Sequence, residues 1–324
     1  MLAAMLSVPA WAANAALPGT LNYVEGQANV GNQSLNAKQI GSVELEPGQR
    51  LNTQNGKAEV LLTPGVFLRV GQNSAAQLVS WSLTNTEARL NKGQALVEVA
   101  EIHKDNLLRI TSNGATTQLR KEGLYGFDAD SGAVRVFKGE ALVQDGDQSV
   151  RVKGGRELDL NAGGTLKARK FDKESYEKSD LYRFSNLRAQ YLSEANANAA
   201  QIYRAGGPGW YGPGWYWDPF FTSYTWIPGN GILYSPFGWG FYSPGLAYAA
   251  PIYYRGYGAY GYYRPSGRYP HVTGQPGVQH VGMPHVAGPR PVGGVRGGAP
   301  AGHFGVMGGG FHGGGGFHGG PSHR

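Results

Sequence analysis

Few residues of this chain have the types and spacing that chemistry requires, and the clearest are two acidic pairs. Asp128 and Asp130 form one pair, followed by Ser131-Gly132, and Asp145 and Asp147 form the other, on either side of Gly146. Paired carboxylates can bind calcium or act as general acid and base, but calcium takes about six to eight oxygen ligands and no later glutamate completes either loop. Asp and Gly at strand ends form turns unaided, so we interpret both pairs as turns.

Nucleophilic catalysis finds little support in the residues. Before residue 205 there is a single histidine, His103, in a polar stretch, with no Gly-x-Ser-x-Gly motif and no phosphate-binding loop. The absence of cysteine excludes thiol catalysis, disulfides and cysteine-ligated zinc. We therefore predict an exposed loop histidine, no catalytic residues, no cofactor and no enzymatic activity. A glycan-active enzyme would require Asp128, Asp130 or glutamates to line one cleft.

Seven histidines lie in the last 54 residues, and imidazole binds zinc, copper and nickel well. His312 and His318, each in a Gly-Phe-His-Gly sequence, are the weak candidates for metal ligands. Glycine-rich spacing fixes no coordination geometry, so we predict no dedicated metal site.

Aromatic side chains are the sharpest candidates for a binding site. Flat rings stack on sugars and on apolar partners, and Arg255, Arg264 and Arg268 could meet anionic groups, as on a cell-surface glycan, a lipopolysaccharide or an envelope protein. The alternative is that the rings fold back over the rest of the protein, because large exposed apolar patches are uncommon in soluble monomers. The tryptophans assigned to this aromatic surface are Trp210, Trp215, Trp217, Trp226 and Trp239.

Nucleic acid is a weaker option as a partner. One Arg-Gly-Gly triplet at residues 296–298 and the interleaved aromatics resemble RNA-binding tails. A secretion signal would place the protein away from RNA, so we predict no nucleic-acid partner.

A change in composition near residue 205 divides the chain. Residues 20–205 hold 23 basic and 21 acidic residues, whereas residues 206–324 hold six Arg, one Asp, no Lys and no Glu. The second part also holds 33 of the 52 glycines, which is too many for regular elements. The predicted segments are a signal peptide at 1–15, a β-domain at 20–168, a helix at 171–205, an aromatic segment at 206–265 and a disordered tail at 266–324.

The elements that must position these residues are mostly strands. Between residues 21 and 166 short stretches alternate apolar and polar side chains, and turn pairs such as Asn55-Gly56 and Asn113-Gly114 separate them. Lys92–Glu98 recurs as Lys138–Gln144, each copy reading as strand, glycine turn, strand. This pattern predicts an all-β domain, either an antiparallel β-sandwich of jelly-roll type or a β-helical roll built from repeated strand-turn-strand units.

One amphipathic helix and a low-complexity tail follow the β-domain. Leu181, Phe184, Arg188, Tyr191 and Ala195 fall on one helical stripe, Ser179 or Asp180 can cap its start, and a Gly-Gly-Pro sequence ends it. Such a stripe must be buried, most simply against the β-domain.

The N-terminus indicates the compartment. Residues 2–12 form a short apolar run ending in Ala-x-Ala, the pattern of a secretory signal and its cleavage site. The run is shorter than the roughly 20 residues of a membrane span. No Lys or Arg precedes Lys38, so either the true start lies upstream of Met1 or the run is no signal. We expect a periplasmic or secreted protein of a Gram-negative-type bacterium without a transmembrane segment.

The β-region resembles the FecR domain family, extracytoplasmic all-β modules of bacterial envelope proteins. The residues that carry the resemblance are Tyr23–Ala28, Pro47–Thr53, Val66–Gly71, Gly93–Glu98, Val136–Val143 and Gly155–Leu158. The best-known members relay a signal from an outer-membrane iron-siderophore receptor to a cytoplasmic sigma factor, using a cytoplasmic anti-sigma segment and a transmembrane helix. This sequence has neither, so the resemblance implies an envelope location and a fold.

These observations favour a non-enzymatic binding or scaffold protein of the bacterial envelope, in which the FecR-like domain mediates protein or envelope interaction. The alternative is a component of a transmembrane signalling system of the iron-uptake type.

Overall fold

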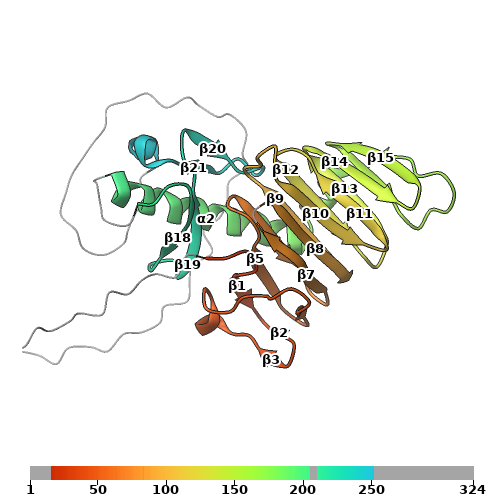
Figure 1. Ribbon diagram of the computed structural model, residues 1–324, viewed down its shortest axis with the longest axis horizontal. Coiled ribbons are helices and arrows are strands. Elements are labelled where there is room, and N and C mark those ends of the chain that lie inside the picture. The colour runs from red at the N-terminus through yellow and green to blue at the C-terminus, as the bar shows by residue number, and fades with distance from the viewer. Residues whose placement is uncertain (1–15, 83, 205–209, 252–324) are drawn as a thin grey trace, which may run out of the picture. The chain divides into compact units, whose positions relative to one another are not determined.

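The computed structural model describes residues 16–82, 84–204 and 210–251, which form a two-sheet β-domain followed by one long helix and two hairpins (Figure 1). The predicted signal peptide, the Gly/His-rich tail with His312 and His318, and Arg255, Arg264 and Arg268 lie outside these residues. The all-β prediction with one amphipathic helix is confirmed.

The first sheet has eight antiparallel strands in the order β1-β5-β6-β9-β12-β13-β16-β17. Its strands are β1 (Leu21–Glu25), β5 (Lys57–Leu61), β6 (Val66–Val70), β9 (Gln94–Val99), β12 (Gly123–Asp128), β13 (Ala133–Lys138), β16 (Arg156–Asp159) and β17 (Arg169–Lys170).

The second sheet has nine strands in the order β15-β14-β11-β10-β8-β7-β4-β2-β3, and within it only β8 and β10 pair in parallel. Its strands are β2 (Ala28–Val30), β3 (Gln33–Ser34), β4 (Arg50–Thr53), β7 (Ala75–Ser82), β8 (Asn85–Lys92), β10 (Leu107–Ser112), β11 (Ala115–Leu119), β14 (Glu140–Asp145) and β15 (Gln148–Lys153). A short 3-10 helix, η1 (Ala37–Gln39), precedes β4.

The main hydrophobic core lies between the two sheets. Alternate residues of each strand point inward, such as Val60, Val97 and Val136 from the first sheet and Leu78 and Ile110 from the second. Side chains of opposite parity point away from this core, as the pleat of a strand requires. The apolar residues of the period-two pattern in the sequence are therefore the residues that form this core.

The repeated strand-turn-strand unit carries the chain from one sheet to the other. In the first copy β8 of the second sheet leads into β9 of the first sheet, and in the second copy β13 of the first sheet leads into β14 of the second. The turn glycines Gly93 and Gly139 have φ of 71° and 100°, a conformation that side chains with a Cβ rarely adopt. Each copy is thus a crossover between sheets.

The predicted helix is present as α2 (Asp180–Arg204), preceded by the short α1 (Lys173–Glu177). The Tyr182 amide donates to the Ser179 hydroxyl at 3.3 Å, so Ser179 caps the helix as expected. Leu181 and Phe184 pack on Leu96, Leu124 and Phe137 of the first sheet, which confirms that the helix buries its stripe against the β-domain.

Two aromatic hairpins complete the described chain and lie on either side of α2 (Figure 1), so the expectation that this part has too many glycines for regular elements is wrong for residues 214–242. One pairs β18 (Gly214–Asp218) with β19 (Ser223–Ile227), and the other pairs β20 (Ile232–Tyr234) with β21 (Gly240–Tyr242). A 3-10 helix, η2 (Pro244–Ala249), follows and packs through Ala247 on Ala197 and Ala200 of α2. We call α2, the two hairpins and η2 the aromatic module.

Candidate functional site

The outward face of the first sheet is covered by the aromatic module. Strands β5 and β6 are buried at every residue and β9 at all but Gln94, because the second sheet lies on one side and the module on the other. Leu61, Phe67 and Ala100 meet Trp226 and Phe241 of the hairpins in a second apolar cluster. Besides these apolar side chains, the same face carries buried charges.

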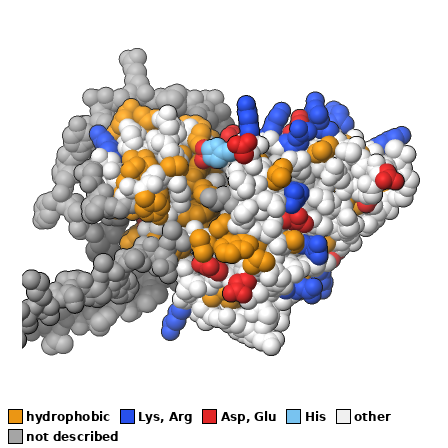
Figure 2. All heavy atoms as spheres, in the orientation of Figure 1, with side chains coloured by type: hydrophobic (Ala, Val, Ile, Leu, Met, Phe, Trp, Pro, Cys, Tyr) orange, Lys and Arg blue, Asp and Glu red, His pale blue; other side chains and the backbone are white. Residues whose placement is uncertain are grey.

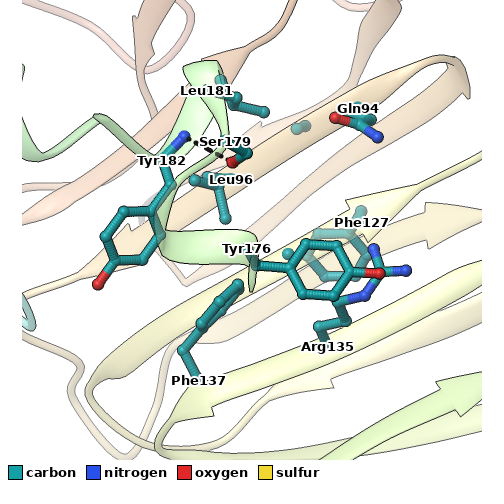
Figure 3. A pocket seen from close by; sticks show the side chains of 11 residues that line it. Gln94, Leu96, Phe127, Arg135, Phe137, Tyr176, Ser179, Leu181 and Tyr182 are labelled. Atoms are coloured by element: carbon teal, nitrogen blue, oxygen red, sulfur yellow. Dashed lines mark hydrogen bonds between the residues drawn. The ribbon is translucent and has the colours of Figure 1, made fainter. Parts of the chain in front are cut away.

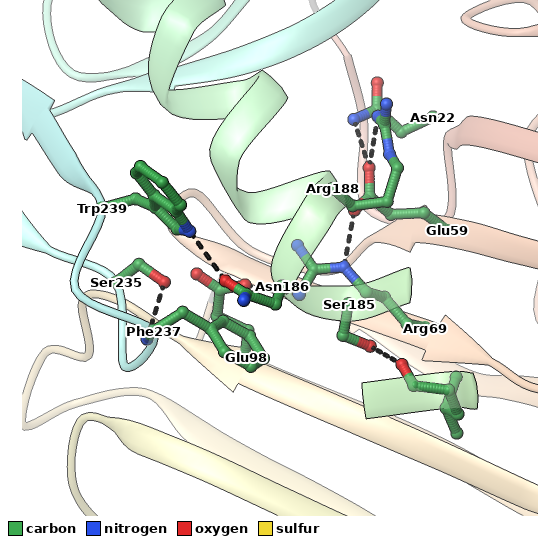
Figure 4. A network of polar contacts seen from close by, with 11 residues as sticks. Asn22, Glu59, Arg69, Glu98, Ser185, Asn186, Arg188, Ser235, Phe237 and Trp239 are labelled. Atoms are coloured by element: carbon green, nitrogen blue, oxygen red, sulfur yellow. Dashed lines mark hydrogen bonds and ion pairs between the residues drawn. The ribbon is translucent and has the colours of Figure 1, made fainter. Parts of the chain in front are cut away.

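Glu59 is the centre of the buried charged network (Figure 4). Its carboxylate accepts from Arg188 of α2 at 2.8 Å, from Arg69 of β6 at 2.8 Å and from the Asn22 amide of β1 at 3.0 Å. The other side of the Arg69 guanidinium donates to Glu98 of β9. The network therefore balances two arginines against two glutamates in a place without solvent.

The arginines decide the charge state of Glu59. Burial by itself raises the pKa of this carboxyl group, but the guanidinium groups of Arg188 and Arg69 outweigh burial and hold the pKa below its ordinary value of 4.5. In the same way burial lowers the pKa of Arg69, while Glu98 and Glu59 raise it on balance. Glu59 and Arg69 are therefore charged at neutral pH.

A second set of charged contacts joins the start of α2 to the sheet. Lys57 of β5 forms ion pairs of 2.8 Å with Glu25 of β1 and with Asp180 of α2. Arg188 also lies over the Tyr23 ring, 4.3 Å from its centroid. These contacts tie Asp180 and Arg188 of α2 to specific residues of β5 and β1.

The junction of α1 and α2 with the first sheet leaves only a small notch (Figure 3). The Tyr176 ring closes it from outside and covers the Arg135 guanidinium, 3.9 Å from the ring centroid. With a volume of about 30 Å³ the notch has room for little more than a water molecule. The notch is therefore too small for an organic ligand.

Two buried asparagine side chains hold the hairpins by forming hydrogen bonds with backbone groups, as a neighbouring strand would. Asn22 donates to the Tyr224 carbonyl at 3.0 Å and accepts from the Tyr224 amide at 2.7 Å. Asn196 of α2 donates to the carbonyls of Trp226 at 2.9 Å and Tyr242 at 3.1 Å, and accepts from the Tyr242 amide at 2.7 Å. These side chains satisfy backbone groups that water cannot reach.

The structure divides the five tryptophans that the sequence assigned to a binding surface. Trp226 is fully buried and Trp215 is 4% exposed, so the expectation that they belong to an exposed surface is wrong for both. Their indoles fill the space above Phe67 and Leu61, where large apolar area is needed to cover the sheet. These two rings cover the β-domain, as the alternative interpretation of the sequence stated.

The other three tryptophans keep some contact with solvent. Trp217 is half-buried against Tyr224, and Trp239 is half-buried with its indole nitrogen donating to Asn186 at 2.8 Å. Trp210 is the most exposed of the five, at 37%.

Trp210 belongs to a stack of parallel rings. Its ring lies 5.4 Å from Tyr216 at 14°, and the Tyr211 ring lies 4.7 Å from Tyr216 at 17°. The Tyr216 hydroxyl donates to the Gly212 carbonyl at 2.6 Å, which fixes the central ring. Tyr203 of α2 contacts both Trp210 and Tyr216 and so anchors the stack at the C-terminal end of the helix.

Exposed aromatic and aliphatic side chains are concentrated on the aromatic module. In the part of the chain that the structure describes, ten large hydrophobic side chains are exposed, and seven of them lie on α2 or beyond it. Figure 2 shows hydrophobic side chains gathered over the region of α2 and β18–β21. The seven are Leu187, Ile202, Trp210, Tyr211, Phe220, Tyr234 and Tyr248.

Four of these residues lie around the C-terminal end of α2. Ile202 is on its last turn, Trp210 and Tyr211 are tied to it through Tyr203 and Tyr216, and Arg204 lies over the Tyr248 ring at 5.6 Å. We call Ile202, Trp210, Tyr211 and Tyr248 the aromatic end. Of this group Trp210 was predicted by residue number, and Tyr211 and Tyr248 belong to the aromatic residues singled out as candidates from the sequence. Ile202 is an ordinary apolar residue in sequence, and only folding leaves it exposed.

The acidic pairs form turns, as the sequence indicated. Asp128 accepts from the amides of Asp130 and Ser131, and Asp130 accepts from the Gly93 amide at 3.0 Å. His103 is an exposed loop residue, 3.6 Å from Glu101. Among the described residues no three His, Cys, Asp or Glu side chains gather in a geometry that could hold a metal ion.

Within residues 16–82, 84–204 and 210–251, no helix is long and apolar enough to cross a membrane.

The charged network of Glu59, Arg69 and Glu98 was not predicted. Its only signal in the sequence is a charged residue in the middle of each of three apolar strands, a pattern that normally places the charge in solvent.

Comparison with known proteins relates the β-domain to one family. Residues 49–142, from the residue before β4 into β14, match the family model described as FecR protein. No curated protein matches the chain.

Two solved structures show a distant likeness, both of a "putative anti-sigma factor" from Parabacteroides distasonis ATCC 8503. One has 13% identity and a TM-score of 0.35 and covers 39% of this chain and 62% of that chain, so the match spans less than two thirds of its length. The other has 14% identity and a TM-score of 0.35 and covers 55% of this chain and 97% of that chain.

Proposed function

We propose that the protein is a non-enzymatic component of a signalling system of the bacterial envelope, with its aromatic end as the binding site for a protein partner. The match of residues 49–142 to the FecR family supports a signalling role over that of a passive scaffold. In this proposal the β-domain works outside the cytoplasm, and the membrane-spanning step of the signal belongs to a partner or to a segment beyond the described residues.

The observation that carries the proposal is the exposure of the aromatic end. Tyr211 and Tyr248 are 63% and 65% exposed, although buried rings of the same module show that it can cover aromatics completely. Tyrosine and tryptophan are enriched in the cores of protein interfaces, where they supply large contact areas with little loss of side-chain entropy. The parallel rings around Tyr216 are already stacked for such contact.

The buried network supports the proposed coupling between the aromatic end and the β-domain. Asn196 and Arg188 lie on the same helix as Tyr203, and they fasten that helix to the hairpins and to Glu59 of the first sheet. A partner that moves the end of α2 therefore acts on specific charged and hydrogen-bonded contacts in the sheet.

The test is affinity purification of the full chain from envelope fractions of the native host. The variant Trp210→Ala/Tyr211→Ala/Tyr248→Ala removes three exposed rings, and the matched control Trp81→Ala/Leu107→Ala removes exposed apolar side chains of the second sheet. We expect the wild type and the control to retain the same partner and the triple variant to lose it. Transcript profiles should change with the triple variant and stay unchanged with the control.

Two results would sink the proposal. One is a triple variant that retains every partner of the wild type while its melting temperature is unchanged. The other is loss of a partner from the control and the triple variant alike, since that result assigns the contact to the β-domain.

A further inference from the structure

The outward face of the second sheet is free of the aromatic module and carries ordered rows of polar side chains. Outward residues on its strands alternate with buried ones, as the burial of β8, β10 and β11 shows. Strand pairing brings seven of them into one cross-strand row: Arg50, Gln77, Arg89, Thr111, Thr116, Gln144 and Ser149.

A second row runs beside the first. It joins Glu87, Arg109, Gln118, Leu142 and Arg151 across five strands. Neighbouring strands lie about 4.8 Å apart, so the six steps of the first row extend over about 29 Å. The face therefore offers two long parallel lines of hydrogen-bonding groups, which we call the polar rows.

The polar rows carry more positive than negative charge, with four arginines and one glutamate. Three of their arginines, Arg50, Arg89 and Arg151, are exposed. Among the described residues no acidic side chain lies within ion-pair distance of Arg50 or Arg89, and Arg151 forms a long ion pair with Glu140 at 3.8 Å. Arg109 is paired with Glu87 at 3.2 Å, and that glutamate also accepts from Thr111. Between the first sheet and α2, by contrast, the buried arginines Arg69 and Arg188 are paired with glutamates.

The chemistry of the polar rows distinguishes between kinds of anionic partner. Leu142 is the only apolar side chain in the two rows, so they lack the buried anchors on which protein interfaces depend. They contain no aromatic ring on which the bases of a single-stranded nucleic acid could stack. Side chains of Thr, Gln and Ser between arginines can instead bond the hydroxyl groups of a sugar chain while arginines pair with its acidic groups.

We propose that the polar rows of the second sheet bind an extended, negatively charged polysaccharide. The polymer lies across the strands, with its anionic groups on Arg50, Arg89 and Arg151 and its hydroxyl groups on the threonines and glutamines between them. This site is separate from the aromatic end and does not depend on the signalling role.

The experiment measures binding of the full chain to dextran sulfate, with neutral dextran, poly-glutamate and single-stranded DNA as comparisons. The variant Arg50→Gln/Arg89→Gln/Arg151→Gln should weaken the Kd for dextran sulfate at least about tenfold, since each arginine near an anionic surface contributes about fivefold. The matched control Lys38→Gln/Lys178→Gln/Arg183→Gln removes the same charge from exposed residues elsewhere. It should change the Kd less than about twofold.

Both variants keep the arginines that follow residue 205, so the difference between them reports on the polar rows alone. A third variant, Thr111→Val/Thr116→Val, keeps the charge and removes two hydroxyl groups, and it should weaken dextran sulfate binding but not poly-glutamate binding. Equal binding by the arginine variant and its control overturns the proposal. Equal losses for dextran sulfate, poly-glutamate and DNA overturn the assignment to a polysaccharide.

Discussion

The carboxylate of Glu59 accepts a hydrogen bond of 2.8 Å from the Arg188 guanidinium, although 129 residues separate the two in sequence. Glu59 belongs to β5 of the first sheet and Arg188 to α2, so this bond joins the β-domain to the aromatic module. Both side chains are buried, and a buried ion pair that loses one partner leaves the other charge uncompensated. The attachment of α2 therefore depends on this contact.

Replacing Glu59 by Gln should destabilise the protein by about 3–5 kcal/mol, because Arg188 then remains buried without its counter-charge and Arg69 keeps only Glu98. Urea unfolding followed by circular dichroism measures the change. The control is Arg169→Gln, which breaks a largely exposed ion pair with Glu157 and should cost less than about 1 kcal/mol. Similar midpoints for the two variants would show that the network does not hold α2.

The same network predicts a loss of stability in acid. The pKa of Glu59 in the folded protein lies below its ordinary value of 4.5, so the unfolded chain binds the extra proton first as the pH falls. The stabilisation is complete above about pH 4.5 and is lost as the pH falls through the folded-state pKa.

Urea midpoints measured between about pH 7 and about pH 3 test this prediction. Burial raises the pKa values of Glu101 and Glu194 in the folded protein. These two groups therefore favour the folded state as the pH falls, which opposes the effect of Glu59. The comparison that isolates Glu59 is therefore the wild type against Glu59→Gln, whose stability should depend less on pH in this window. Parallel pH profiles for the two proteins would contradict the assignment.

Asn196→Ala should loosen both hairpins. The Asn196 side chain bonds the Trp226 carbonyl and both backbone groups of Tyr242, and its removal should cost about 3 kcal/mol because buried backbone groups lose a partner. Hydrogen exchange should rise in β19 and β21 more than in β9. The exposed Asn91→Ala is the control and should leave the exchange pattern as it is.

Gly93→Ala tests the crossover between the sheets. An alanine at position 93 would have to adopt the left-handed backbone of the glycine, which costs about 1–2 kcal/mol. Its Cβ would also collide with Ser74. Gly114 also has a left-handed backbone, with φ of 81°, but a Cβ at this position would meet no atom within 4 Å. Thermal melting should show a larger loss for Gly93→Ala, and an equal loss would mean that the collision relaxes without cost.

Several features of the fold follow from local pattern. The alternation in Val134-Arg135-Val136 and the turn at Asn113-Gly114 predict strands and their ends, because each depends only on neighbouring residues. The helix after residue 171 is predicted in the same way from its stripe and from Ser179 at its start. The resemblance to FecR domains in the strand and turn residues agrees with the family match over residues 49–142.

The repeated unit shows where local pattern stops. Lys92–Glu98 and Lys138–Gln144 predict two similar strand-turn-strand units, yet nothing in them shows that each turn leads to the opposite sheet. That property depends on which distant strands already pair on each side, such as β12 beside β9 and β11 beside β14. Strand order in a sheet of this kind is set by contacts between residues far apart in the chain.

The amino-acid sequence by itself determined an all-β domain, one amphipathic helix and an aromatic segment, because composition and periodicity act through neighbouring residues. Tertiary structure alone decided that Trp226 is buried and Tyr211 exposed, and that Glu59, Arg69 and Glu98 are enclosed beneath α2. The physical reason is that alternation along a strand decides only which side chains point away from the core. Whether those side chains meet water or protein depends on what folds over that face of the sheet. In this protein α2 and its hairpins cover the first sheet and leave the polar rows of the second exposed.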